Sequence, residues 1–298
     1  MKTYFFTGKG GAGKSTIASA FGWQLSQHHF KTLLISLDPA HNLKDIFDIN
    51  SKKSQWQINS CLSIWEPDFE QIKYDYFNQR LQLLKGVTQH LSAFNLEKYL
   101  NTLKYSPGHE DYAAILFLTR ILKNEKQNYD VIVFDTPPTG MMLRIFSLPM
   151  VSVLWIDKLI KLREKIVDKR QVISGIRAEN KNNEKRRDAI LEKLNQLHAD
   201  YSGLEHFYKN EAQVYVVANE DRLALNESIR LIKELKNLDI NLAGIVHNKY
   251  KATMEIEMDK LLGCQGTPVF KVQEQSIEEK REYELLVNLL EELGIHND

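Results

Sequence analysis

Residues 8–15 read Gly8-Lys9-Gly10-Gly11-Ala12-Gly13-Lys14-Ser15, and this stretch decides which fold the chain adopts. It satisfies G-x-x-x-x-G-K-[ST] and lies between an apolar run at residues 3–7 and a helical pattern that starts at Ser15. Glycines let a backbone wrap closely around a phosphate, because positive φ angles carry no Cβ penalty there. Consecutive N–H groups and the helix N-terminus then offer partial positive charge to the anion. The stretch therefore predicts the phosphate loop of a P-loop nucleotide-binding domain.

Two lysines in this loop have different expected roles. Lys14 is expected to reach the β- and γ-phosphate oxygens, and the Ser15 hydroxyl is expected to bind Mg²⁺. Lys9 cannot easily fold back onto its own nucleotide while Lys14 occupies that space. It is better placed to reach a nucleotide on a facing subunit and to stabilise charge on the transferred phosphoryl group, the alternative being a solvated loop lysine. The predicted ATP-binding set in this region is Gly8, Lys9, Gly10, Gly11, Ala12, Gly13, Lys14, Ser15 and Thr16.

Two aspartates follow apolar runs that read as buried strands. Asp38 follows residues 32–37, Asp135 follows residues 131–134, and each has a proline within two residues. Ligands of doubly wound sheets bind at the carboxyl ends of the strands, so both acids are expected to converge on the phosphate loop. We expect Asp135 to hold the Mg²⁺ shell, and Asp38 to orient or deprotonate the attacking water. The alternative for a strand-end aspartate is a helix cap or a turn residue.

Short apolar runs alternate with helical patterns over most of the chain. This alternation predicts an α/β fold, a doubly wound and mostly parallel sheet covered by helices on both faces. We interpret residues 1–298 as a single P-loop ATPase domain with helical insertions at about 68–123 and 150–210. The expected strands are 3–7, 32–37, 131–134, 214–217, 243–246 and 269–270, and the expected helices outside the insertions are 15–28, 223–236 and 277–293.

Composition limits the classes of partner. The 298 residues carry 39 basic and 39 acidic side chains, so no net charge attracts nucleic acid or anionic lipid. The longest unbroken apolar run, residues 112–118, is far shorter than the roughly 20 residues of a membrane span, so we expect no direct membrane insertion. Cys61 and Cys264 form neither a C-x-x-C pair nor a disulfide framework. These features predict a cytoplasmic protein that binds no nucleic acid.

The loops taken together resemble the arsenite-pump and tail-anchored-protein targeting ATPase family. The family's D-P-A-H switch I matches residues 38–41, its D-T-x-P-T-G-x-x-L-R switch II matches residues 135–144, and its P-G-x-x-E loop matches residues 107–111. The resemblance implies Mg²⁺-dependent ATP hydrolysis by a homodimer that couples hydrolysis to conformational switching. It also implies nucleoside contacts from Asp221 and Asn248, for which a helix N-cap and a turn residue are the respective alternatives.

The chain also departs from this family. It has no C-x-x-C zinc clasp and no clustered cysteines, and Met141 and Met142 replace the His and Thr usual in switch II. The resemblance therefore implies the ATPase without naming the client. Residues 150–167 place most of their apolar side chains on one helical face, and residues 190–204 show a narrower apolar seam. This pattern is typical either of a surface for a hydrophobic or helical partner or of two helices that pack on each other.

A function of another class uses the same loop. In a nucleotide-gated scaffold of the partitioning or septum-positioning type, hydrolysis acts as a timer for binding DNA or membrane. That function requires a basic DNA-binding surface or a C-terminal amphipathic membrane helix. The terminal residues 278–298 are strongly acidic, which favours the switch ATPase.

Overall fold

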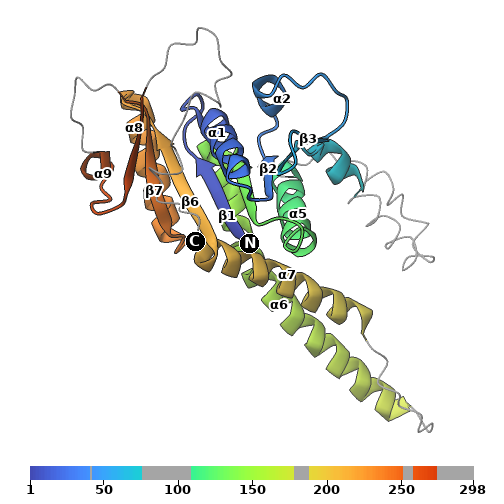
Figure 1. The fold of residues 1–298 in the computed structure, drawn as a ribbon. Helices are drawn as coiled ribbons and strands as arrows, with labels where there is room; N and C mark the ends of the chain where they lie inside the picture. The colour runs from blue at the N-terminus through green and yellow to red at the C-terminus, as the bar shows by residue number, and fades with distance from the viewer. Residues whose placement is uncertain (41, 76–108, 178–187, 251–257, 274–298) are drawn as a thin grey trace. The chain divides into compact units, whose positions relative to one another are not determined.

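The computed structural model describes residues 1–40, 42–75, 109–177, 188–250 and 258–273 (Figure 1). Within these residues the strands form one sheet in the order β3-β4-β2-β5-β1-β6-β7-β8, and every neighbouring pair is parallel except β3 with β4. The strands are β1 (Lys2–Thr7), β2 (Thr32–Ser36), β3 (Gln55–Gln57), β4 (Leu62–Trp65), β5 (Val131–Asp135), β6 (Ala212–Ala218), β7 (Leu242–Tyr250) and β8 (Val269–Gln273).

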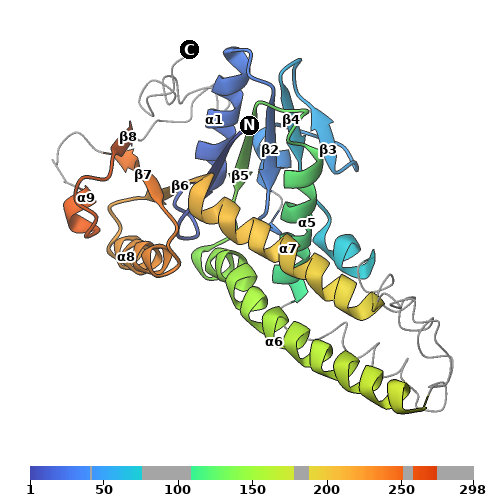
Figure 2. The same cartoon turned by 90° about the horizontal axis from the view of Figure 1, so that it is seen from below.

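Helices cover both faces of the sheet, as predicted for a doubly wound α/β fold. Helix α1 lies on one face, and α5 and α8 lie on the other (Figure 2). Crossovers between parallel strands are right-handed, so the direction in which the chain moves along the sheet decides which face the connecting helix covers. The chain moves in one direction from β1 to β2 and in the opposite direction from β6 to β7. The described helices are α1 (Lys14–Gln27), α2 (Asn42–Ile46), α5 (His109–Asn124), α6 (Thr139–Arg177), α7 (Ala189–Asn210), α8 (Arg222–Asn237) and α9 (Met258–Leu261).

The chain divides into two compact units. One comprises residues 1–145 and 211–298 and contains the whole sheet. The other comprises residues 146–210 and consists of α7 and most of α6. The interpretation of residues 1–298 as a single domain stays a prediction.

Most expected elements are confirmed, with several differences. The expected strands 243–246 and 269–270 are longer and reach Tyr250 and Gln273, and β3, β4, α2 and α9 were not predicted. The helix that was expected from about residue 150 begins at Thr139 and continues through Pro149. The expected helix at 277–293 and residues 76–108 of the first insertion lie outside the described residues.

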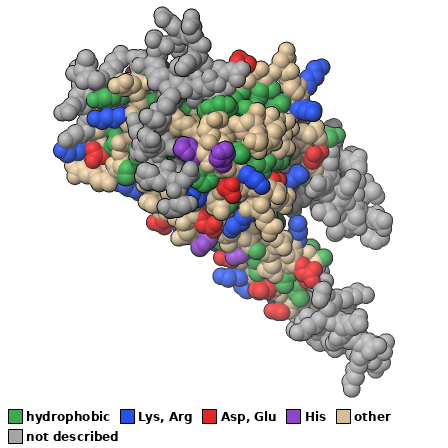
Figure 3. All heavy atoms as spheres, in the orientation of Figure 1, with side chains coloured by type: hydrophobic (Ala, Val, Ile, Leu, Met, Phe, Trp, Pro, Cys, Tyr) green, Lys and Arg blue, Asp and Glu red, His purple; other side chains and the backbone are tan. Residues whose placement is uncertain are grey.

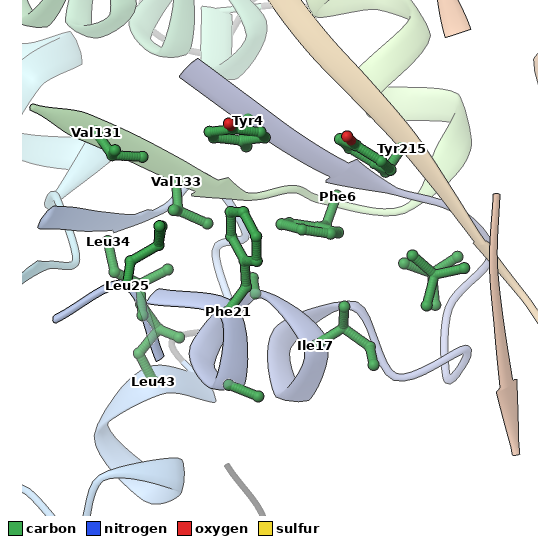
Figure 4. Close-up of a cluster of buried hydrophobic side chains, with 14 of the residues drawn as sticks. Tyr4, Phe6, Ile17, Phe21, Leu25, Leu34, Leu43, Val131, Val133 and Tyr215 are labelled. Carbon is green, nitrogen blue, oxygen red and sulfur yellow. The ribbon is translucent and has the colours of Figure 1, made fainter. Parts of the chain in front are cut away.

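An aromatic cluster fixes α1 against the sheet (Figure 4). The ring of Phe21 meets Tyr4 and Phe6 edge-on, with centroids 4.8 and 5.3 Å apart, and Phe6 stacks on Tyr215 at 5.5 Å. All four side chains are buried. Because β1 and α1 flank residues 8–13, this packing holds both ends of the phosphate loop.

Helix α6 contains a long, largely apolar segment in which polar residues separate short apolar runs. Residues Thr139–Lys169 are long and apolar enough, by length and composition, to cross a membrane. Part of this segment is buried in the protein. Core helices of proteins that never enter a membrane meet the same criteria, so this segment does not by itself assign a membrane role.

Candidate functional site

The phosphate loop links the end of β1 to the start of α1, and two of its glycines are fixed by close contacts. Gly8 and Gly13 have φ angles of +150° and +94°. A Cβ on Gly8 would collide with the carbonyl oxygen of Val217, and a Cβ on Gly13 would collide with the side-chain amide of Asn248. Only glycine fits at these two positions, so this loop conformation requires the two glycines that the sequence supplies there.

The loop ends at the N-terminus of α1. Gly13 is the N-cap residue of α1 and, as a glycine, makes no side-chain hydrogen bond that would cap the helix. The loop turns tightly before it, since the Ala12 N–H donates to the Lys9 carbonyl at 3.2 Å. The first N–H groups of α1 therefore keep their capacity to bind an anion, strengthened by the helix dipole.

Lys14 lies almost fully buried at the start of α1. Its side chain is 6% exposed, and its Nζ donates to the Lys9 carbonyl oxygen at 3.3 Å. Burial lowers the pKa of this ammonium, while the nearby carboxylates of Asp135 and Asp38 act to raise it. A buried cation with a backbone carbonyl as its hydrogen-bond acceptor is well suited to receive an anionic ligand.

Asp135 is fully buried at the carboxyl end of β5 and faces the start of α1. Its Oδ2 accepts a hydrogen bond from Ser36 Oγ at 3.4 Å, and it also bonds to the Ser15 side chain. Its Oδ1 is buried and has no hydrogen-bond partner among the described residues. Burial raises the pKa of Asp135 to about 7, against the opposing effects of Ser15 and of the Lys14 charge. The predicted metal ligands Ser15 and Asp135 are thus brought together.

The chemistry of this pair fits a magnesium ion. Mg²⁺ prefers oxygen ligands and is usually held by one or two carboxylates together with substrate phosphates, rather than by a complete protein cage. The partnerless Oδ1 of Asp135 and the Ser15 hydroxyl supply such oxygens. Across the described residues no group of three or more His, Cys, Asp or Glu side chains gathers into a metal site.

Asp38 lies half-buried just after β2, and its hydrogen bonds shape the turn that follows. Its Oδ1 accepts from the Ala40 N–H at 3.0 Å, and its own N–H donates to Ser36 Oγ at 3.2 Å. Its charge acts on both Lys14 and Asp135, which places it beside the phosphate loop. Asp38 therefore has the turn role that was its alternative, and its role as the base stays a prediction. His41 of the same motif lies outside the described residues.

The two residues expected at the nucleoside both contact the phosphate loop. Asp221 caps α8 by accepting from the Ala224 N–H at 2.9 Å, and it forms an ion pair with Lys9 Nζ at 3.0 Å. These bonds hold the pKa of Asp221 below its usual range. Asn248 Nδ2 donates to the Ala12 carbonyl at 2.8 Å. The nucleoside contacts of Asp221 and Asn248 stay predictions.

A family model described as anion-transporting ATPase matches residues 1–283. The chain belongs to the anion-transporting ATPase family. Relatives include a putative arsenical pump-driving ATPase 2 of Aquifex aeolicus (28% identity, covering 84% of this chain and 80% of the relative) and a putative arsenical pump-driving ATPase 1 of the same organism (27%, covering 84% and 63%). An ATPase ASNA1 homolog of Entamoeba histolytica is 32% identical, covering 84% of this chain and 76% of the relative.

Membership of the anion-transporting ATPase family makes this protein an ATPase and confirms the resemblance found in its loops. The predicted P-loop α/β fold is likewise confirmed. The partitioning or septum-positioning alternative receives no support from these relatives. The chain spans between 63% and 80% of the lengths of the three relatives named above.

The site of this anion-transporting ATPase includes residues that the sequence did not single out. Ser36, the last residue of β2, contacts both Asp38 and Asp135. The Asn42 side chain donates to Ser15 Oγ at 3.5 Å. The available signal was the position of Ser36, a small polar residue that follows three apolar residues of β2 and precedes the predicted catalytic Asp38 by two residues.

Proposed function

We propose that the protein is a Mg²⁺-dependent homodimeric ATPase that couples ATP hydrolysis to a conformational switch. The observation that carries this proposal is the convergence of Lys14, Ser15 and Asp135 at the N-terminus of α1. This arrangement offers a cation, a row of N–H donors and metal-binding oxygens to one triphosphate. Asp38 lies beside the same loop, as hydrolysis requires.

Each side chain has a defined role in hydrolysis. The N–H groups of the loop and Lys14 bind the phosphate oxygens and stabilise the charge that develops on them. Ser15 and Asp135 would hold Mg²⁺, which when bound neutralises phosphate charge. Asp38 orients the attacking water and accepts its proton, since a carboxylate within hydrogen-bond reach of the water acts as a general base.

The dimer is proposed from the position of Lys9. Its Nζ is paired with Asp221 of its own chain, and the two side chains are 28% and 53% exposed. Ion pairs that are open to solvent contribute little to stability, so this pair does not prevent Lys9 from moving to another anion. We propose that Lys9 exchanges Asp221 for the triphosphate of a facing subunit when the dimer closes.

Mixing two inactive variants tests this role. A mixed dimer contains one Lys9→Ala subunit and one Lys14→Ala subunit. The nucleotide site of the Lys9→Ala subunit keeps its own Lys14 and faces the intact Lys9 of the other subunit, so this site is complete. Equal mixing is expected to restore about a quarter of the wild-type rate, because about half of the dimers are mixed and each has one complete site. Phosphate release and the fraction of mixed dimers are measured together. No recovery in a preparation shown to contain mixed dimers contradicts a role of Lys9 across the interface.

The proposed switch is supported by an ion pair between α5 and the start of α6. Arg144, in the switch II motif, donates from Nε to Asp111 Oδ2 at 2.7 Å. Asp111 is 3% exposed, so this ion pair is made by a carboxyl group that is largely removed from water. Helix α6 begins at Thr139, shortly after Asp135, so a displacement of switch II on hydrolysis would move the first turn of α6 and the Arg144 side chain with it.

The client is proposed from the exposed face of α6. Hydrophobic side chains reach the surface between charged ones over the α6–α7 unit (Figure 3). On α6 they recur at helical spacing and are flanked by Lys158, Lys161 and Lys165. Exposed apolar surface of this kind is characteristic of interaction sites, and we propose a hydrophobic, helical protein client. The exposed residues are Val151, Leu154, Trp155, Leu159, Leu162 and Ile166.

Charged substitutions separate client binding from packing. Trp155→Asp and Leu159→Asp alter side chains that are 63% and 46% exposed, so the proteins are expected to fold and to hydrolyse ATP. We expect them to lose binding of a fluorescent, apolar helical peptide, measured by anisotropy. Ile156→Asp, at a neighbouring residue that is 7% exposed, is the control and is expected to destabilise the protein. Aggregation of the first two variants contradicts the proposed client face.

The cytoplasm is the proposed location. ATP is abundant there, and Cys61 and Cys264 are both free thiols in the structure. A free-thiol assay on protein isolated from intact cells tests this location, since modification or oxidation of both thiols contradicts it.

A further inference from the structure

Asn248 lies near the end of β7, and both the nitrogen and the oxygen of its side-chain amide form hydrogen bonds. Its side chain is 9% exposed, its Nδ2 donates to the Ala12 carbonyl oxygen at 2.8 Å, and its Oδ1 accepts from the Lys249 N–H at 3.0 Å. The hydrogen bond between Ala12 and Asn248 joins residues that are 236 positions apart in the chain. A buried amide held at both ends has a fixed orientation.

The backbone of β7 is distorted where this side chain leaves the strand. Lys249 has a φ of +56°, and the pairing of β7 with β8 shifts register between Asn248 and Tyr250. Non-glycine residues rarely adopt this left-handed conformation, and bulges often redirect a side chain beside an active site. The bond from the Lys249 N–H to Asn248 Oδ1 stabilises this local geometry. Strand β7 thus has an unfavourable backbone conformation at Lys249, next to the residue whose side chain contacts the phosphate loop.

The phosphate loop is shaped to receive this amide. A Cβ on Gly13 would collide with the Asn248 nitrogen, so the absence of a side chain at Gly13 makes room for it. The Ala12 side chain is itself buried, at 1% exposure. Asn248 therefore contacts the peptide between Ala12 and Gly13 and cannot shift without disturbing it.

We propose that Asn248 is a positioning residue that fixes the orientation of the Ala12–Gly13 peptide for phosphate binding. In a trans peptide the C=O and N–H point in opposite directions, so holding the Ala12 oxygen toward Asn248 directs the Gly13 N–H to the other side. If this peptide flips, a carbonyl oxygen replaces an N–H donor in the loop and repels the phosphate. The inference rests on the proposed nucleotide site. It differs from an adenine contact because its effect is independent of the base.

Three ligands distinguish these roles. Binding of ATP, GTP and inorganic tripolyphosphate, all with Mg²⁺, is measured by calorimetry for the wild type, Asn248→Ala and Asn248→Asp. For the alanine variant we expect all three affinities to fall by a similar factor, on the order of five- to tenfold for one lost hydrogen bond. Asn248→Asp is expected to lose more, because its carboxylate faces the Ala12 carbonyl.

Val246→Ala is the matched control for strand stability. Val246 is fully buried in β7 and does not carry the bond to the loop, so its truncation lowers the melting temperature while leaving tripolyphosphate affinity unchanged. Asn248→Ser, which keeps a hydroxyl donor, serves if the alanine variant does not fold, and it is expected to show a smaller but still uniform loss.

Two results would overturn the inference. One is a loss confined to ATP, which makes Asn248 a base contact; the other is an equal loss of tripolyphosphate binding in Val246→Ala, which makes the effect one of general stability. Absence of ATP and tripolyphosphate binding in the wild type contradicts the proposed function itself, and the two failures are thereby distinguished.

Discussion

Replacing Lys14 by alanine is expected to reduce ATP hydrolysis to background, a loss of at least about 10²-fold, typical of removing one donor to a developing oxyanion. Lys14 is the buried cation at the start of α1, so its loss removes the positive charge that faces the phosphates. Nucleotide binding should weaken together with turnover. Phosphate release and calorimetry with ATP provide the two measurements.

Lys52→Ala is the control for a general effect of removing a lysine. Lys52 is exposed in the segment between α2 and β3, and we place it outside the site. This variant is expected to match the wild type in rate and affinity. Wild-type turnover in Lys14→Ala would contradict the assignment of residues 8–15 as the catalytic phosphate loop.

Replacing Asp38 by asparagine is expected to slow hydrolysis by about 10²- to 10⁴-fold, the usual contribution of a general base, while ATP binding stays near normal. Asparagine keeps an Oδ1 that can accept from the Ala40 N–H, so the turn after β2 should persist. The effect then reports the lost base rather than a rearranged loop. Single-turnover hydrolysis measures the chemical step, and calorimetry measures affinity.

Asp45→Asn is the matched control for Asp38→Asn. Asp45 is an exposed aspartate on α2, and its replacement makes the same change of charge close by in sequence. We expect little change in its rate. If Asp38→Asn turns over as fast as Asp45→Asn, Asp38 serves only the turn.

The sequence predicted the phosphate loop and the sheet because their signals are local. Gly8 and Gly13 belong to a short motif that can be recognised in the sequence, and each central strand is a short apolar run that ends in a polar loop. Strand β3 was not predicted because it lacks such a signal. Gln55 and Gln57 give β3 little apolar character, because it lies at the edge of the sheet and its side chains are only partly covered.

Helix α6 begins before the expected start at about residue 150 and includes Pro149 in its interior. Proline removes one helical hydrogen bond and normally ends or kinks a helix. Here the helix begins at Thr139, directly after Pro138, and continues past Pro149 to Arg177. Tertiary context outweighs the local cost of the proline, and local rules carry no information on that context.

Two contacts of the phosphate loop with distant parts of the chain could not be predicted from the sequence. The Lys9–Asp221 pair links residues 212 positions apart, and the Asn248–Ala12 bond spans 236 positions. No spacing rule connects such residues. They meet because the parallel order β5-β1-β6-β7 brings the carboxyl ends of separate strands to one edge of the sheet.

Phosphate release from ATP by the purified wild-type protein, with Mg²⁺ and with excess EDTA, tests the central claim most directly. The proposed site predicts slow hydrolysis with Mg²⁺, none with EDTA, and strongly reduced hydrolysis in Asp135→Asn, which replaces the partnerless carboxylate oxygen with an amide. Equal rates with Mg²⁺ and EDTA, or wild-type rates in Asp135→Asn, would contradict it.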